Sequence, residues 1–335
     1  MCGKLCNPLW DTPGVRTERE VFVRRWRRVV YGTAVALIAA SCSPGTSDEP
    51  SRALVAQVAS FDIAADLQQR FVVGLFAADR GEVTFGTVDL SFALLEDGAE
   101  NIGPGPTEAS FIPLPGSDTN GGAGPTFEAP VYARGVYGTK PISFDQPGFW
   151  EVTVNAVVDG TAFTATALFE VEPEPLVPIP GEPAPRTVQP LPGDPAVEPG
   201  AIESRTEFGG ELPDPILHRM TIADAISAGR PVMVVIATPV FCVSQFCGPI
   251  TDEVQRLAER HSDEVEFVHL EVWQDFEEFI VNPAALEWIA PKDQSEGAEP
   301  WVFLVDEDGI IVNRWDNVAS VAELEEGLAE LLSDQ

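Results

Sequence analysis

Between residues 54 and 171, hydrophobic and polar positions alternate over short runs, and no helical period of useful length is present. The alternation predicts β-strands at residues 71–76, 87–94, 150–157 and 161–169. Asp159-Gly160 separates the last two runs and is a strong signal for a tight hairpin turn. Such strands bury their apolar faces when two sheets pack together, so this segment is predicted to form an all-β sandwich.

From Leu212 onward the pattern changes to alternating helices and strands. Residues 232–237 are continuously apolar, which predicts a strand buried on both faces. Pro249 suits the first turn of a helix, where a proline removes no intrahelical hydrogen bond. Further strands are expected at 265–273, 301–305 and 310–312, and further helices at 221–228, around 284–289 and from 321. This order predicts an α/β domain over residues 212–335.

The segment between these two regions, residues 172–211, is rich in proline. Ten of the 29 residues from Glu172 to Gly200 are prolines. Proline at this density excludes regular helix and interior strand, and favours an extended polyproline II chain. At about 3.1 Å per residue, such a chain reaches up to roughly 90 Å. The segment is therefore interpreted as a semi-rigid spacer, and binding of its PxxP-like stretches to an aromatic groove is the alternative.

The stretch from Phe144 to Val152 resembles the closing hairpin of several bacterial extracytoplasmic immunoglobulin-like modules. The resemblance implies an immunoglobulin-like sandwich for residues 54–171. Trp150, Tyr132 and Tyr137 could form a surface for stacking a ligand, but aromatic side chains at strand spacing more often fill a core. The stretch from Gly98 to Pro125, rich in Gly, Pro and Ser, is interpreted as a mobile loop.

The N-terminal 41 residues are predicted to be an extension followed by an export signal. A basic cluster at residues 24–28 precedes an apolar run of 12 residues, 29–40. This run is too short to cross roughly 30 Å of hydrocarbon and has the length of a secretory signal core. Residues 1–20 fit neither a signal nor a domain, and a start at Val21 or Val23 is expected.

The end of the signal, Ala39-Ala40-Ser41-Cys42, resembles a bacterial lipoprotein signal. The resemblance implies that Cys42 is lipidated, that residues 42–53 form a polar tether, and that the protein lies on the extracytoplasmic face of the cell membrane. Simple cleavage after Ser41 and an uncleaved anchor are the alternatives. If Cys2 and Cys6 leave with the signal and Cys42 carries lipid, Cys242 and Cys247 remain as a pair in an oxidising compartment.

Charge excludes one class of partner. The chain has 53 acidic and 20 basic residues, a formal net charge of −33. Such a chain repels phosphates, so nucleic acid is not expected as a partner. The charge is interpreted as a general adaptation to salt or to secretion rather than as an acidic binding face.

Cys242 and Cys247 are the candidate reactive residues. Their spacing, Cys-x4-Cys, lets a short loop bring the two Cα atoms within the 4.4–6.8 Å or so that a disulfide requires. Cys247 is expected at the N-terminus of the helix that contains Pro249, where free N–H groups and the helix dipole stabilise a thiolate. We therefore take Cys247 as the candidate nucleophile and the better leaving group, with Cys242 as the resolving cysteine.

Two short motifs resemble the thioredoxin family. Phe246-Cys247-Gly248-Pro249 is similar to its Trp-Cys-Gly-Pro-Cys corner, and Glu299-Pro300-Trp301 stands where that family has its cis-proline. The chain departs from the family at Ile250, which occupies the place of the second cysteine, at Phe246, and in the strand 232–237, which lacks a buried carboxylate. The resemblance implies a thioredoxin-like fold for residues 212–335, with Glu299 and Pro300 presenting backbone groups to a substrate beside the sulfurs.

Other interpretations of the cysteine pair remain open. The disulfide could be a structural staple in a peptide-binding module. A peroxidase is disfavoured because Thr238 is not three residues before Cys242 and no arginine lies in the loop. Copper delivery would need a histidine near the thiols. His218, His261 and His269 are not placed for this, and His269 is expected to be an ordinary sheet residue. No cofactor and no metal site is predicted.

Together these segments predict a two-domain protein, an all-β immunoglobulin-like sandwich followed by an α/β thioredoxin-like domain, joined by a proline-rich linker. The favoured function is thiol–disulfide exchange on exported proteins through Cys247 and Cys242. The alternative is a non-catalytic surface scaffold with a structural disulfide. A third possibility is that the sandwich is the functional domain and the C-terminal region supports it.

Overall fold

The computed structural model describes residues 54–333, with gaps at residues 78, 96–102, 118–123, 130–133, 208, 243 and 292–296. The predicted signal, tether and lipidation site at Cys42 lie outside the described residues, as do Tyr132 and much of the loop 98–125. Among the helices that are described, none is both long and apolar enough to span a bilayer.

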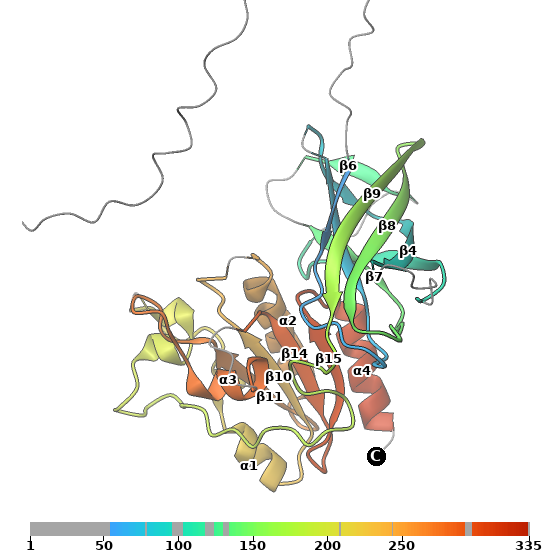
Figure 1. Ribbon diagram of the computed structural model, residues 1–335. Helices are drawn as coiled ribbons and strands as arrows, with labels where there is room; N and C mark the ends of the chain where they lie inside the picture. The colour runs from blue at the N-terminus through green and yellow to red at the C-terminus, as the bar shows by residue number, and fades with distance from the viewer. Residues whose placement is uncertain are drawn as a thin grey trace, which may run out of the picture. The chain divides into compact units, whose positions relative to one another are not determined.

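Residues 54–171 form one antiparallel sheet of nine strands within the described part of the chain (Figure 1). Its strand order is β6-β3-β2-β7-β5-β4-β8-β9, and β1 pairs with β2 beside this path. The strands are β1 (Leu54–Val58), β2 (Val72–Ala77), β3 (Gly81–Thr84), β4 (Thr87–Leu94), β5 (Thr107–Pro113), β6 (Thr126–Glu128), β7 (Gly135–Thr139), β8 (Gly148–Val158) and β9 (Thr161–Val171).

The core of this sheet is aromatic. Phe71, Phe92, Phe144 and Phe169 contact one another with ring centroids 5.0–6.3 Å apart, and Trp150 packs edge-on against Phe144. Trp150 is 1% exposed, so it does not belong to a ligand-stacking surface. Tyr137 is likewise buried, and its hydroxyl donates a hydrogen bond to the carbonyl of Phe85. Both residues take the core role that strand spacing favours.

The C-terminal region is built on a four-stranded mixed sheet with the order β11-β10-β14-β15. β10 (Val232–Ala237) is parallel to β11 (Glu266–Glu271) and antiparallel to β14 (Trp301–Val305), which pairs with β15 (Ile311–Asp316). The helices are α1 (Ile222–Ser227), α2 (Cys247–His261), α3 (Pro283–Ile289) and α4 (Val321–Ser333). A small ribbon, β12 (Trp273–Asp275) and β13 (Ile280–Val281), and 3₁₀ turns at Pro199–Ala201, Ser204–Thr206 and Pro215–His218 complete the region.

β10 contributes to two hydrophobic cores because successive side chains point to opposite faces of the sheet. Val232, Val234 and Ile236 pack with α1 and α3. Met233, Val235 and Ala237 pack with α2 and α4 on the other face. All six side chains are fully buried, which accounts for the unbroken apolar run.

The proline-rich segment packs against the C-terminal region. Thr187 is fully buried and accepts a hydrogen bond of 2.9 Å from the indole N–H of Trp288 in α3, while its hydroxyl donates to Glu287. The side chain of Gln189 accepts from the N–H of Ile222 at the start of α1. Pro183 forms an isolated β-bridge with Ile310.

Partly buried ion pairs connect the segment between β1 and β2 to β15 and α4. Arg314 of β15 lies 2.8 Å from a carboxylate oxygen of Asp62 and also donates to the carbonyl of Val177. Arg70 contacts Glu323 of α4 at 2.7 Å and donates to the carbonyl of Val318. Residues 49–335 accordingly form one compact unit.

The predicted fold class is therefore wrong. Residues 54–171 form a single continuous sheet rather than the two facing sheets of an immunoglobulin-like sandwich. The structure as a whole is mostly β, and its helices cover only a small mixed sheet in which one of three strand pairs is parallel, so it is not clearly an α/β thioredoxin fold. Local periodicity identifies strands but not their partners, so it predicts four of the nine strands of this sheet (β2, β4, β8 and β9) and not their assembly.

The contact of Thr187 with α3 provides a first prediction. Replacing Thr187 by Val keeps the shape of the side chain but leaves the buried N–H of Trp288 without an acceptor, which costs about 1–3 kcal/mol. We expect the free energy of unfolding in urea to fall by that amount. Thr164→Val, which removes an exposed hydrogen bond to Asn155, should change it by about 0.5 kcal/mol or less. Equal effects of the two substitutions would contradict a docked proline-rich segment.

Candidate functional site

Cys242 and Cys247 form a disulfide at the start of α2, with Cα atoms 6.0 Å apart. The predicted pairing is thus present in the structure. The strand β10 ends at Ala237, and the loop that follows leads to Cys247, the first residue of the helix. Gln245 in this loop has a φ of 65°, a left-handed conformation that is uncommon for a residue with a side chain.

The two sulfurs differ in exposure. Cys247 is 0% exposed and belongs to the core between α2 and the sheet, whereas Cys242 is half-buried. The sulfur of Cys242 lies 3.1 Å from the hydroxyl of Ser244. Cys242 is therefore the more accessible sulfur of the two, whereas the sequence analysis names Cys247 as the candidate nucleophile. Cys247 keeps its predicted place at a helix N-terminus, where a thiolate is favoured.

Phe246, which replaces the tryptophan of the resembling motif, connects this site to the large sheet. It is buried in a small apolar cluster with Val72 of β2, Ile112 of β5, Val136 of β7 and Val318. The disulfide loop is thus held by the nine-stranded sheet as well as by its own helix.

Glu299 lies beside the sulfurs, and its peptide bond to Pro300 is cis. An oxygen of the Glu299 carboxyl and the two sulfur atoms all lie within 4.8 Å of one another. Burial, reinforced by the neighbouring carboxylate of Glu271, raises the pKa of Glu299 to about 8, although a backbone hydrogen bond from Thr238 and the positive charge of His269 oppose the rise. Near neutral pH the carboxyl group is thus predominantly protonated and able to donate a proton.

From the sequence, Glu299 is predicted to take part only through its backbone, and its position next to Pro300 is the signal that could have placed its carboxyl near the sulfurs. His269 is predicted to be an ordinary sheet residue, and neither it nor His218 is predicted to belong to a site. In the structure their rings are 5.3 Å apart, beside Glu203 and Asp214 and separate from the cysteine group.

Two cavities border the disulfide. The first contains Cys242 and is lined on the helix side by Gly248, Pro249, Asp252 and Arg256, and on the side of the large sheet by Leu114 and Arg134. The second contains Glu299, with Ser244, Phe246, Val58, Phe76 and Val136 among its lining residues. The half-buried Cys242 thus lines the first cavity, between α2 and the large sheet, and Glu299 lines the second.

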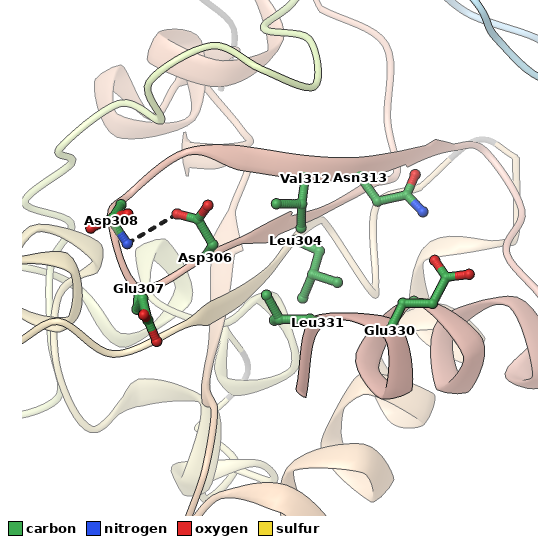
Figure 2. A pocket seen from close by; sticks show the side chains of 9 residues that line it. Leu304, Asp306, Glu307, Asp308, Val312, Asn313, Glu330 and Leu331 are labelled. Carbon is green, nitrogen blue, oxygen red and sulfur yellow. Dashed lines mark hydrogen bonds between the residues drawn. The ribbon is translucent and has the colours of Figure 1, made fainter. Parts of the chain in front are cut away.

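A third cavity lies between the β14–β15 turn and α4 (Figure 2). Leu304, Val312 and Leu331 form its apolar part. The carboxylate of Asp306 accepts hydrogen bonds from the N–H groups of Asp308 at 3.0 Å and Ile310 at 2.8 Å. Asp306 therefore shapes the turn, and none of the predicted site residues lines this cavity.

Comparison with known proteins adds no assignment. No protein-family model matches the chain, and a search of curated proteins finds no significantly similar sequence.

The buried carboxyl of Glu299 predicts a pH dependence of stability. The folded protein holds this proton up to a pH of about 8, whereas the unfolded chain releases it near pH 4.5. Stability therefore falls as pH rises through this window. Glu299→Gln should lose less stability over this window, although Glu82, whose pKa burial raises to about 7, and the buried Glu271 still contribute a loss. The variant should be more stable than the wild type by more than about 1.4 kcal/mol above pH 8, since the shift of Glu299 exceeds one pKa unit.

Urea unfolding at several pH values between 4.5 and 9 measures this difference. Glu264→Gln, at an exposed position after α2, controls for the loss of one negative charge and should run parallel to the wild type. A constant difference between Glu299→Gln and the wild type at all pH values would contradict a raised pKa of Glu299.

Proposed function

We propose that the protein carries out thiol–disulfide exchange on other exported proteins through the Cys242–Cys247 disulfide. The observation that supports this most is the grouping of a half-exposed sulfur, a buried sulfur at a helix N-terminus and a protonated carboxyl within 4.8 Å. A disulfide that only staples a loop does not need a proton donor beside it. The similarity of the Cys247 and Pro300 motifs to thioredoxin-family sites agrees with this proposal.

The difference in burial between the two cysteines favours Cys242 as the sulfur that is attacked first. A substrate thiolate attacks the sulfur of Cys242, a bond forms between the two sulfurs, and the bond from Cys242 to Cys247 breaks. Cys247 leaves with the electron pair as a thiolate at the start of α2, which favours its departure. A second thiolate of the substrate then attacks the substrate sulfur of the mixed disulfide and releases Cys242. The substrate loses two electrons and the protein gains them.

Glu299 supplies a proton in this sequence. Its carboxyl oxygen lies within 4.8 Å of both sulfurs, so the proton passes to the departing thiolate without a long transfer path. In the reverse reaction the carboxylate accepts the proton from the attacking thiol, and this deprotonation is the task of a general base. A pKa near 8 suits both directions, because the group is close to half-ionised at mildly alkaline pH.

A non-catalytic scaffold remains the second candidate function. The observation in its favour is the complete burial of Cys247, together with the packing of Phe246 against the large sheet. In that case the disulfide only fixes the loop between β10 and α2.

Two single-cysteine variants separate these functions. Cys247→Ser leaves the half-buried Cys242, whose thiolate can attack a disulfide of an exported protein in the reverse reaction. The mixed disulfide should accumulate in living cells, because Cys247 is no longer present to displace the substrate. Cys242→Ser leaves only the buried Cys247 and should accumulate several-fold less. Non-reducing gels with and without dithiothreitol measure the adducts, and the double variant Cys242→Ser/Cys247→Ser sets the background.

The reduction potential of the Cys242–Cys247 pair completes the test. A potential above about −300 mV places the pair in the range of exchangeable disulfides. If neither single variant forms adducts and the potential is well below that value, the disulfide is structural and the exchange function is disproved.

A further inference from the structure

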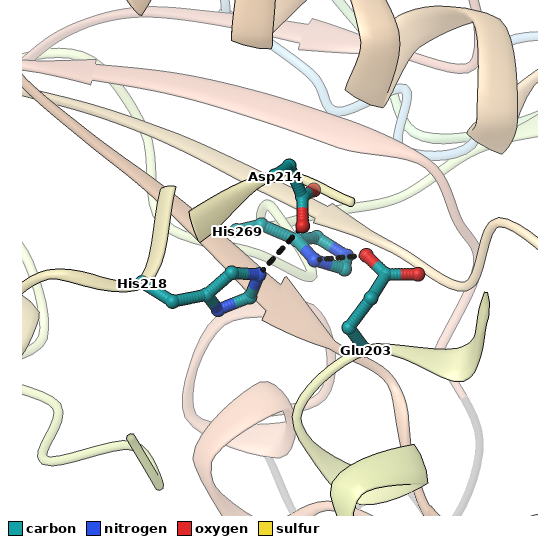
Figure 3. A group of neighbouring side chains, drawn as sticks. All are labelled: Glu203, Asp214, His218 and His269. Atoms are coloured by element: carbon teal, nitrogen blue, oxygen red, sulfur yellow. Dashed lines mark ion pairs between the residues drawn. The ribbon is translucent and has the colours of Figure 1, made fainter. Parts of the chain in front are cut away.

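Four titratable side chains meet in the interior of the C-terminal region, away from the cysteine group (Figure 3). Glu203 precedes the turn Ser204–Thr206, Asp214 and His218 flank and end the turn Pro215–His218, and His269 lies in β11. Their exposures are 0%, 0%, 5% and 1%. One nitrogen or oxygen atom from each lies within 4.8 Å of the other three.

Three of the nitrogen and oxygen atoms that face one another in this cluster have no hydrogen-bond partner. Nδ1 of His269 lies 3.0 Å from Oε2 of Glu203, and Nε2 of His218 lies 3.2 Å from Oδ1 of Asp214. Despite these distances, Asp214 Oδ1, His218 Nε2 and His269 Nδ1 are buried without a hydrogen bond of acceptable geometry. Burying polar atoms unpaired is costly, and three such atoms in a group whose facing atoms lie within 4.8 Å of one another need an explanation.

A second layer of contacts orients these groups toward their common centre. Nε2 of His269 lies 3.0 Å from the carbonyl of Ala237. A hydrogen bond donated there leaves the Nδ1 lone pair directed at the cluster. Arg205 binds both carboxylates. Its Nε lies 2.9 Å from Glu203 Oε1, and its Nη2 lies 2.8 Å from Asp214 Oδ2 and 3.0 Å from Glu203 Oε2, the oxygen that faces His269. Metal-binding histidines and carboxylates are held by this kind of outer contact.

We propose that these four residues bind a single zinc-class divalent ion through two imidazole nitrogens and two carboxylate oxygens. Bonds of about 2.0–2.2 Å to zinc place neighbouring ligand atoms of a tetrahedron roughly 3.3 Å apart, close to the observed 3.0 and 3.2 Å. Imidazole nitrogen favours zinc and related transition metals, whereas calcium and magnesium take oxygen ligands. Because all four positions come from the protein, the ion has a structural role. It ties the segment 203–218 to β11.

A metal-free network is the competing explanation. Two carboxylates can be balanced by Arg205 and by a protonated His269, because the attraction of Glu203 raises the pKa of His269 even though burial opposes it. That network needs no ion and gains nothing from one. Direct measurement of metal therefore separates the two explanations.

The experiment uses full-length protein prepared without a histidine tag. The protein is unfolded in EDTA, and one half is refolded with ZnCl₂ and the other half in EDTA, since a fully buried site fills as the chain folds. After extensive dialysis we expect one zinc ion per chain by elemental analysis, and a higher melting temperature than the EDTA-refolded sample has. Refolding with CoCl₂ should give the intense visible absorption of four-coordinate cobalt.

The three histidines of the chain provide matched variants. His218→Gln and His269→Gln should each weaken zinc binding by about 100-fold or more, measured by competition with a chromophoric chelator. His261→Gln, at the end of α2 and outside the cluster, should bind as the wild type does. Folding of each variant is first checked by circular dichroism, and the result for the wild type stands even if a variant does not fold.

Two outcomes would overturn the proposal. One is wild-type protein that, refolded in zinc, retains no ion after dialysis and melts at the same temperature as the EDTA sample. The other is loss of zinc from His261→Gln to the same extent as from His218→Gln. The adduct assay on Cys242 and Cys247 is independent of both, so exchange activity and metal binding fail or succeed separately.

Discussion

The burial of β10 on both faces is the constraint on which the rest of the C-terminal region depends. Six apolar side chains must be covered at once, and each of the five larger than alanine stabilises the fold by about 1.5–3 kcal/mol only if helices lie over both sides of the sheet. The end of this strand then determines where chemistry takes place. Ala237 accepts the hydrogen bond from His269 with its carbonyl, and the loop that starts after it leads to the disulfide. Both sites described above are thus built outward from one strand.

Buried carboxyl groups have different partners in the cluster around Arg205 and beside the disulfide. The chain is strongly acidic, and its buried carboxylates are mostly satisfied by arginine, as with Arg205 at Glu203 and Asp214 and Arg314 at Asp62. Glu299 is different, because burial and a neighbouring carboxylate outweigh the groups that favour its ionisation. A paired carboxylate stays ionised and holds structure, while a buried and weakly compensated one keeps its proton and can transfer it.

The proline-rich segment has a structural task that its composition does not reveal. Proline has no N–H group to satisfy and loses little backbone freedom on folding, so an extended chain of this kind can lie along a folded surface at low cost. Its end supplies Glu203 to the buried cluster, and Thr187 in its middle joins α3. The reach calculated for a free spacer therefore does not describe this segment. Its contacts hold the segment against the C-terminal region, within the unit formed by residues 49–335.

Local features were determined by the sequence itself. The apolar run of β10, the hairpin at Asp159-Gly160, the start of α2 near Pro249 and the pairing of Cys242 with Cys247 all depend on residues close together in the chain. Tertiary structure decided the remainder. The joining of nine strands into one sheet, the approach of the Glu299 carboxyl to the sulfurs and the meeting of His218 with His269 each bring together residues tens of positions apart. Such contacts depend on which hydrophobic surfaces pack against each other. The period of hydrophobic residues along the chain predicts which face of an element is buried, but not which other element covers that face.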